Sequence, residues 1–388
     1  MMLRLLAASS VLALADAHGA LVTPRSRNAV DFEEITNNAS AGIHNVWAQC
    51  SNITGAPCNN GQATYWYSQG CFIGCDECDH VSGRRQTDLC NSGFVGQLPD
   101  HAISVNRDQV RDSKYDIYRH NPWRAPGFAP VADACGLAGG TPWASMAPEE
   151  GQYVNTTHAR HGMKGTSLPP LDTGTVWTAG GEEPVVFAVK FNHGGGYSYR
   201  LCPADEELTE ACFQKHPLDF APKQALLFPN GSTLDVSASA VFVNEGTSPA
   251  GSMWTRVALS AAGLGPRCAC DLDNDYNPGD FSCGCKMGEQ VDSCVTAGNC
   301  SLGHCEPCPE TAGSDCSRCD NPPIHPWGRS SFPQPCDDAC LAESPSVLDH
   351  VIVPETIKPG KYVLGFRYDC DSTAQVWSNC ADITIVAA

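Results

Sequence analysis

The cysteine content constrains this chain more than any other feature of its sequence. There are 23 cysteines in 388 residues, and twelve of them lie between Cys268 and Cys340. Apolar residues large enough to build a core are almost absent from that stretch, so it can fold only through cross-links, by disulfides or by bound metal. We therefore expect residues 266–345 to form a cysteine-rich, disulfide-stapled insertion. The odd count also means that at least one cysteine is unpaired, pairs between molecules or binds another group.

The N-terminus predicts export. Arg4 precedes Leu5–Leu14, an apolar run of about ten residues, which suits a signal peptide and is too short to span a bilayer. Ala15-Asp16-Ala17 places small residues where a signal peptidase reads them, so we expect residues 1–17 to be removed and His18 to become the first residue. A cut a few residues away would instead leave the amine of His18 in a peptide bond. A secreted, extracellular chain also favours disulfides over zinc for the CEPC, CSRC and C-x3-C-x2-C spacings.

Short β-rich runs dominate the rest of the chain. Several alternate apolar and polar residues, turn residues bound them, and long amphipathic heptads are absent. This pattern predicts a mainly β fold, an antiparallel immunoglobulin- or fibronectin-like β-sandwich with long loops, over residues 18–265 and 346–388. Cys370 and Cys380 flank an expected turn and are candidates to pair with each other. The expected strands are 184–191, 197–201, 237–244, 254–259, 361–368 and 381–386, with a short helix over 206–213.

The charge and hydropathy of the chain exclude some classes of binding partner. The formal net charge is −19, which argues against nucleic acid and against an anionic membrane, since both favour a basic surface. No run after the N-terminus approaches the length of a membrane span. An acidic surface is compatible with a neutral polysaccharide, and we expect a monomer. Sequons predict a glycoprotein and begin at Asn38, Asn52, Asn155, Asn230 and Asn299.

A free N-terminal histidine is a metal-chelating group. Its amine and its imidazole Nδ1 close a ring around one ion, and a second imidazole completes three nitrogen donors. Such a donor set favours Cu(II), and an amine with a pKa of about 7.7–8.0 loses its proton readily near neutral pH. His193 is the expected second donor because it stands between a predicted strand and a glycine run. His158 and His161 are the alternative, since their spacing could place both on one helical face.

Three segments together resemble a known family. The mature start, HGALVTPRSR at 18–27, is similar to an H-G…P-x-S-R opening, and NHGGGYSYRLCP at 192–203 is similar to a segment that carries a second copper histidine. QVWSNCADI at 375–383 looks like the last core strand of the same proteins. These are the lytic polysaccharide monooxygenases of the chitin-binding type-4 family, in the branch known from arthropods and protists. The resemblance spans nearly the whole mature chain outside the cysteine-rich insertion.

The resemblance implies a catalytic copper site. One copper ion would be held in a histidine brace by the amine and imidazole of His18 and the imidazole of His193. The family usually has Tyr or Phe on the axial side of the copper, where this chain has Trp377, either as an apolar shield or as a core residue. Gln375 would face the same side by strand alternation and hydrogen-bond the bound oxygen species.

The implied activity is oxidative cleavage of insoluble chitin or cellulose at C1 or C4 of the glycosidic bond, with an external electron donor. Tyr65, Trp66 and Tyr67 are candidates for the substrate surface, because exposed rings stack on sugar faces, but burial of these rings is equally consistent with the sequence. Two alternatives stay open at this point: a non-catalytic carbohydrate-binding protein of the same fold, and a secreted copper-binding protein.

Overall fold

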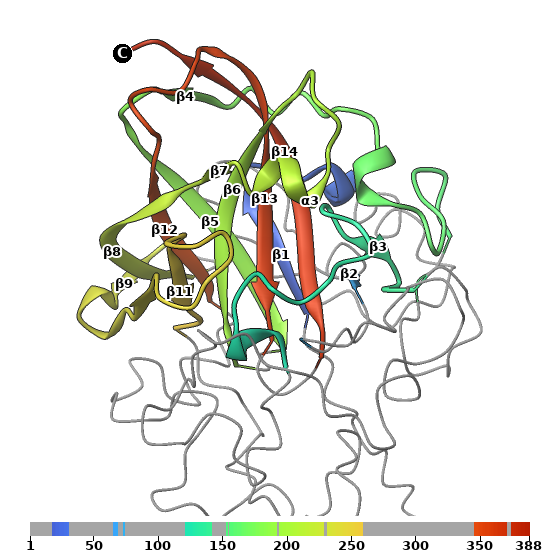
Figure 1. The fold of residues 1–388 in the computed structure, drawn as a ribbon, viewed down its shortest axis with the longest axis horizontal. Helices are drawn as coiled ribbons and strands as arrows, with labels where there is room; N and C mark the ends of the chain where they lie inside the picture. The colour runs from blue at the N-terminus through green and yellow to red at the C-terminus, as the bar shows by residue number, and fades with distance from the viewer. Residues whose placement is uncertain are drawn as a thin grey trace, which may run out of the picture.

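The protein folds as a two-layered β-sandwich, which confirms the fold class expected from the sequence (Figure 1). The computed structural model describes residues 18–30, 65–68, 73, 121–141, 153, 155–191, 194–228, 231–258, 345–370 and 374–388. The predicted signal peptide and residues 266–344 of the predicted insertion lie outside these ranges, so their boundaries stay predictions. In the described part, no helix is long and apolar enough to cross a membrane.

The first sheet has five strands in the order β1-β5-β12-β8-β9 and is antiparallel throughout. In β5, Val185 and Phe187 join the sandwich core, whereas Val186 and Ala188 pack into a smaller cluster on the opposite face. Both faces of this strand are therefore apolar. The bounds are β1 His18–Thr23, β5 Glu182–Phe191, β12 Ser346–Ile352, β8 Asp219–Leu227 and β9 Thr233–Asp235.

The second sheet is larger and has the strand order β10-β11-β6-β13-β14-β2-β3, with β7 paired to β6 and β4 paired in parallel to β14. Its long central strands are β6 Gly196–Pro203, β13 Gly360–Asp369 and β14 Val376–Val386. The short strands are β2 Trp66–Ser68, β3 Leu137–Ala138, β4 Val176–Thr178, β7 His216–Pro217, β10 Phe242–Val243 and β11 Trp254–Arg256. Among the described residues, the helices are α3 Glu210–Phe213 and the 3-10 turns Arg27–Ala29, Pro122–Arg124, Gly165–Ser167 and Ser237–Ser239.

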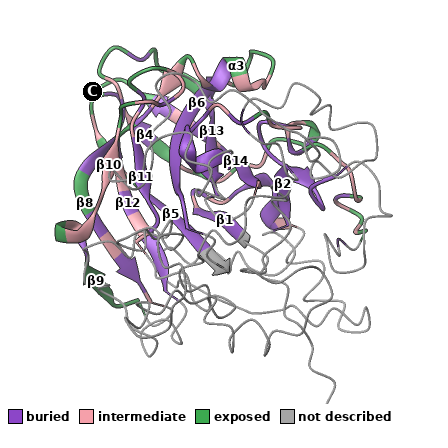
Figure 2. Cartoon of the chain, turned by 60° about the horizontal axis from the view of Figure 1, so that its bottom comes forward, coloured by how far each residue is buried: buried purple, intermediate pink, exposed green. Residues whose placement is uncertain are grey.

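An aromatic core joins the two sheets, and the central strands are buried along most of their length (Figure 2). The ring of Phe187 in the first sheet lies 4.2 Å from that of Tyr197 and 5.1 Å from that of Phe366, both in the second sheet. The strands on either side of the undescribed residues 259–344 both belong to the sandwich, because β11 pairs with β6 and β12 pairs with β5 and β8.

Most of the expected strands are confirmed, and two are shorter than expected. The strand expected over 237–244 is wrong, because Ser237–Ser239 forms a 3-10 turn and the strand is limited to Phe242–Val243. Ser237 donates from its backbone N and its Oγ to Asp235 Oδ1, at 2.9 and 2.6 Å, and this local turn competes with the extended backbone. The expected strand over 254–259 ends at Arg256. The expected helix over 206–213 is limited to α3, where the Thr209 side chain caps the helix.

Strand β8 was not expected from the sequence, and a proline explains why. Pro222 lies in the middle of this strand, where a proline argues against a paired position. The pairing register between β8 and β12 shifts at this point, with Gln224 opposite Asp349 but Phe220 opposite Val351. The irregularity leaves Pro222 out of the regular ladder, so the strand can tolerate it.

The expected pairing of Cys370 with Cys380 is wrong, because Cys380 forms a disulfide with Cys135. In the antiparallel register Cys380 lies opposite Gly365. Cys370 is five residues further along, about 17 Å at the rise of a strand, far beyond the reach of a disulfide. A second disulfide joins Cys202 on β6 to Cys212 in α3.

A buried polar cluster also bridges the two sheets. Asp349 on β12 is fully buried, and its carboxylate accepts hydrogen bonds from the Tyr197 hydroxyl at 2.7 Å and from Gln224 Nε2 at 2.9 Å. Burial raises the pKa of Asp349 to about 7, although both hydrogen bonds oppose that change. The native protein therefore holds a proton here that an unfolded chain would release near pH 4.

We expect this carboxyl to make the protein less stable as the pH rises. Because its folded pKa is raised, its contribution is complete below about pH 4 and is lost as the pH rises through about 7, a change of about 4 kcal/mol. Asp349→Asn should remove most of that change in the free energy of unfolding, measured by denaturant titration from pH 4 to pH 8. Asp219→Asn, on the exposed side of β8, is the control. An unchanged pH profile in Asp349→Asn would contradict the assignment.

Candidate functional site

Five strand ends gather at one end of the sandwich, which we call the site end. It is where β1, β6 and β14 begin and where β5 and β13 end, at the bottom of the view in Figure 1. The two sheets are tied together there, because the backbone N of Leu21 donates to Asn379 Oδ1 at 3.0 Å. Both groups are buried, so this bond fixes the start of β1 against β14.

The predicted ligands belong to two segments that reach the site end. The backbone of His18 lies opposite Phe191 in the β1–β5 ladder, with a register irregularity directly after His18. His193 lies outside the described residues, as does the side chain of His18. The backbone is described at Phe191, two residues before position 193, and at Gly194, directly after it.

Tyr368 contacts both of these segments. Its ring packs against Gly19, where an added Cβ would lie 3.3 Å from Tyr368 Cδ1. Its hydroxyl donates to the carbonyl oxygen of Gly194 at 2.7 Å. One buried side chain thus touches the residue after His18 and the residue after position 193. Sequence reasoning did not single out this tyrosine, because nothing in the strand pattern distinguishes it from an ordinary core residue.

Trp377 is a core residue in this structure. It is buried, lies opposite Tyr368 on β13, and stacks on Tyr67 with ring centroids 4.1 Å apart and planes 21° apart. Gln375 is also buried and precedes β14, and its backbone carbonyl accepts a hydrogen bond from Cys370 N at 3.1 Å. Both residues therefore lie at the site end, while their roles toward copper and oxygen stay predictions.

The aromatic triplet does not offer a sugar-stacking surface, which corrects that expectation. Tyr65, Trp66 and Tyr67 are only 7%, 0% and 3% exposed. Trp66 packs edge-on to Tyr153 with centroids 5.8 Å apart, on the face of β2 away from the sandwich core, while Tyr67 stacks inside that core. Because β2 is covered on both faces, neither Trp66 nor Tyr67 presents an open ring face on which a sugar could stack.

His158 and His161, the alternative metal ligands, make other contacts in the structure. His158 Nε2 lies 3.0 Å from the carbonyl oxygen of Arg27, so this nitrogen is the donor and is not available to a metal. Arg27 itself binds the carboxylate of Asp382 through two hydrogen bonds of 2.8 and 2.6 Å. Asp382 is five residues beyond Trp377, about 17 Å along β14. Burial lowers the pKa of His161, whose ring packs edge-on to Tyr153.

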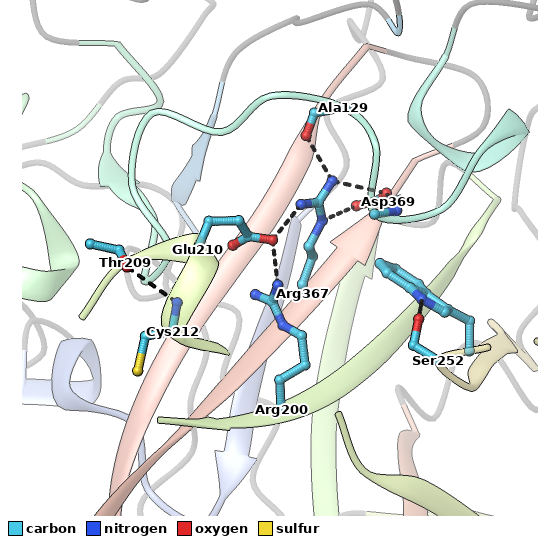
Figure 3. A network of polar contacts seen from close by, with 10 residues as sticks. Ala129, Arg200, Thr209, Glu210, Cys212, Ser252, Arg367 and Asp369 are labelled. Carbon is cyan, nitrogen blue, oxygen red and sulfur yellow. Dashed lines mark hydrogen bonds and ion pairs between the residues drawn. The ribbon is translucent and has the colours of Figure 1, made fainter. Parts of the chain in front are cut away.

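A buried ionic cluster backs the site end from the outer face of the second sheet (Figure 3). Arg367 is completely buried and donates to Asp369 at 2.7 and 3.1 Å, to Glu210 at 2.7 Å and to the Ala129 carbonyl at 2.9 Å. Arg200 forms a second ion pair with Glu210. Burial alone would raise the pKa of Glu210, but the two guanidinium charges outweigh it and lower the pKa to about 2.

The same cluster fixes the loop that covers this face. Asp369 Oδ2 accepts a hydrogen bond from the backbone N of Gly127 at 2.8 Å, and the Arg367 guanidinium lies 5.9 Å from the ring centre of Trp254. Tyr368 stands between Arg367 and Asp369 on β13 and points to the opposite face, into the core. The sequence pattern did not reveal this cluster, since two of the partners of Arg367, Glu210 and the Ala129 carbonyl, lie 157 and 238 residues away.

Among the side chains that the structure places, no group of three or more His, Cys, Asp or Glu residues is arranged to hold a metal ion. The predicted brace lies outside that set, because neither of its imidazoles is described.

Comparisons with known proteins add little to this geometry. No family model and no curated protein matches the chain. Among solved structures, the chain is similar to a chitin-binding domain from Burkholderia pseudomallei, with 12% sequence identity and a TM-score of 0.29. The alignment covers 96% of this chain and 100% of that one. A similarity at this level identifies no function, and the sandwich is defined by its own strand pairing.

We expect removal of the central cation to destabilise the protein strongly. Arg367→Met would leave the buried Asp369 carboxylate without its cation, while Glu210 would keep its ion pair with Arg200. Breaking a buried ion pair by removing one partner costs about 3–5 kcal/mol. The loss should appear in the free energy of unfolding from denaturant titration. Arg160→Met removes an exposed arginine and should cost less than about 0.5 kcal/mol. A loss below about 1 kcal/mol for Arg367→Met would show that the cluster is not required for stability.

Proposed function

We propose that this protein is a secreted, copper-dependent lytic polysaccharide monooxygenase that cleaves chitin or cellulose oxidatively. The observation that carries the proposal is the convergence of the two predicted ligand segments at Tyr368. His18 begins β1 opposite Phe191, and Gly194 is held by the tyrosine that packs on Gly19. The described backbone two residues before position 193 and directly after it therefore lies at the site end, which supports His193 as the proposed second ligand.

The available donors suit copper. Processing before His18 would free an amine beside an imidazole, and His193 would add a second imidazole, which gives the nitrogen-only set that Cu(II) prefers. The core side of the site end is apolar, since Trp377, Tyr67 and Tyr368 are all buried there. Two disulfides agree with an oxidising, extracellular location.

The roles of this chain's residues follow from that arrangement. Bound copper would supply the redox chemistry by which an oxygen co-substrate attacks C1 or C4 of the glycosidic linkage. The His18 amine must be free and unprotonated, so activity depends on processing and on pH. Trp377 and Tyr368 close the core side to water. Gln375 is proposed to donate a hydrogen bond to the oxygen co-substrate, and an external donor supplies the electrons.

Copper binding tests the brace directly. The correctly processed protein should begin at His18 and bind one Cu(II) per chain, measured by N-terminal sequencing and by calorimetry. His18→Ala and His193→Ala should each lose this tight binding, since each removes a donor. His158→Ala is the matched control and should bind as the wild type does, because its Nε2 is used by Arg27. Equal loss in His158→Ala would make the alternative ligand set correct.

Product analysis tests the reaction. Copper-loaded protein with a reductant should release oxidised oligosaccharides from chitin or cellulose, detected by mass spectrometry, and chelated protein should release none. Copper binding without oxidised products or retention on either polymer would indicate a secreted copper-binding protein. Retention that survives His18→Ala, again without oxidised products, would indicate a non-catalytic carbohydrate-binding protein.

A further inference from the structure

We infer that Tyr368 is a positioning residue that sets the spacing between the two copper-binding segments, an inference that rests on the proposed function. The side chain is fully buried and makes a contact with each segment, through its ring at Gly19 and through its hydroxyl at the Gly194 carbonyl. The brace draws two donors from His18 itself. The third donor comes from a distant part of the chain, so its placement depends on contacts of this kind.

Tyr368 is suited to this role because its backbone is held on every side. It is paired to Tyr197 in β6 and to Trp377 in β14, in the middle of the second sheet. Its neighbours Arg367 and Asp369 are locked into the ionic cluster on the outer face. Because its backbone is held in this way, the Tyr368 side chain can hold the segments of Gly19 and Gly194 at a constant distance from each other.

Tyr368 meets a glycine in each of the two ligand segments, and each glycine has a physical reason. At Gly19 a side chain would crowd the ring, with an added Cβ only 3.3 Å from Cδ1. Gly194 has φ +68°, a left-handed conformation that other residues adopt only with strain. The tyrosine hydroxyl therefore meets a backbone carbonyl whose direction depends on a glycine, directly after the predicted ligand.

A purely structural role for the hydroxyl is the competing explanation, and the chain provides a matched control. Tyr362 lies on the same strand, and its hydroxyl also donates to a backbone carbonyl, that of Lys358, at 2.8 Å. It is six residues from Tyr368, about 20 Å along β13. Tyr362→Phe and Tyr368→Phe thus remove the same kind of bond, but only the second is at the site end.

The experiment compares Cu(II) binding and Cu(II) electron paramagnetic resonance spectra of the processed wild type and both variants, with apo-protein stability measured alongside. Tyr368→Phe should weaken Cu(II) binding roughly tenfold or more, as loss of a supporting bond around metal ligands does elsewhere, and should shift the spectrum. Tyr362→Phe should match the wild type in both. Identical binding and spectra in Tyr368→Phe would overturn the inference and leave the proposed function intact.

A second variant guards against loss of folding in Tyr368→Phe. Gly19→Ala keeps the hydroxyl and presses on the ring, and it should also shift the copper spectrum. Gly360→Ala is its control, because an added Cβ there meets Tyr362 only at an ordinary 3.8 Å. A wild-type-like spectrum in Gly19→Ala would count against the inference. A processed wild type that binds no copper would overturn the proposed function and this inference together.

Discussion

The surrounding structure depends on the ion pairs and hydrogen bonds of the buried Arg367 guanidinium. A charge in that position is costly unless it is paired and fully hydrogen-bonded. Asp369 supplies one partner from the same strand, but Glu210 and the Ala129 carbonyl must be brought in from α3 and from the loop at 121–141. These segments must therefore fold onto the outer face of the second sheet. The disulfide at Cys135 and the one at Cys212 fix the same two segments covalently.

Inside the sandwich, a few polar contacts define how the two sheets meet. Apolar packing favours burial but allows one sheet to slide over the other. A buried hydrogen bond forms only when its donor and acceptor are aligned, so it fixes the relative position of the two sheets. Leu21 with Asn379 sets the alignment at the site end, and Asp349 with Tyr197 sets it further along the strands. The first of these bonds holds β1 against β14 three residues after His18.

The sequence predicted the sandwich because its central strands alternate or carry continuous apolar runs, and the structure confirms those at 184–191 and 361–368. It did not predict β8, since a bulge around Pro222 is a property of the pairing and not of the strand. It also left the direction of the rings at 65–67 open, because a strand buried on both faces gives no periodic signal. The ionic cluster escaped notice because its members are brought together only by the tertiary fold.

The position of Trp377 shows why the candidate site and the core cannot be separated. The sequence left two interpretations, an apolar shield beside copper or a core residue, as though they were exclusive. In the sheet, the indole lies between Tyr67 and Tyr368, and Tyr368 in turn packs on Gly19. A residue in that place fills the core and at the same time supports the side chain that contacts both ligand segments. A smaller side chain at 377 would therefore weaken the packing of Tyr368. Because both ligand segments contact Tyr368, their alignment, and with it the geometry of a bound metal, would change as a consequence.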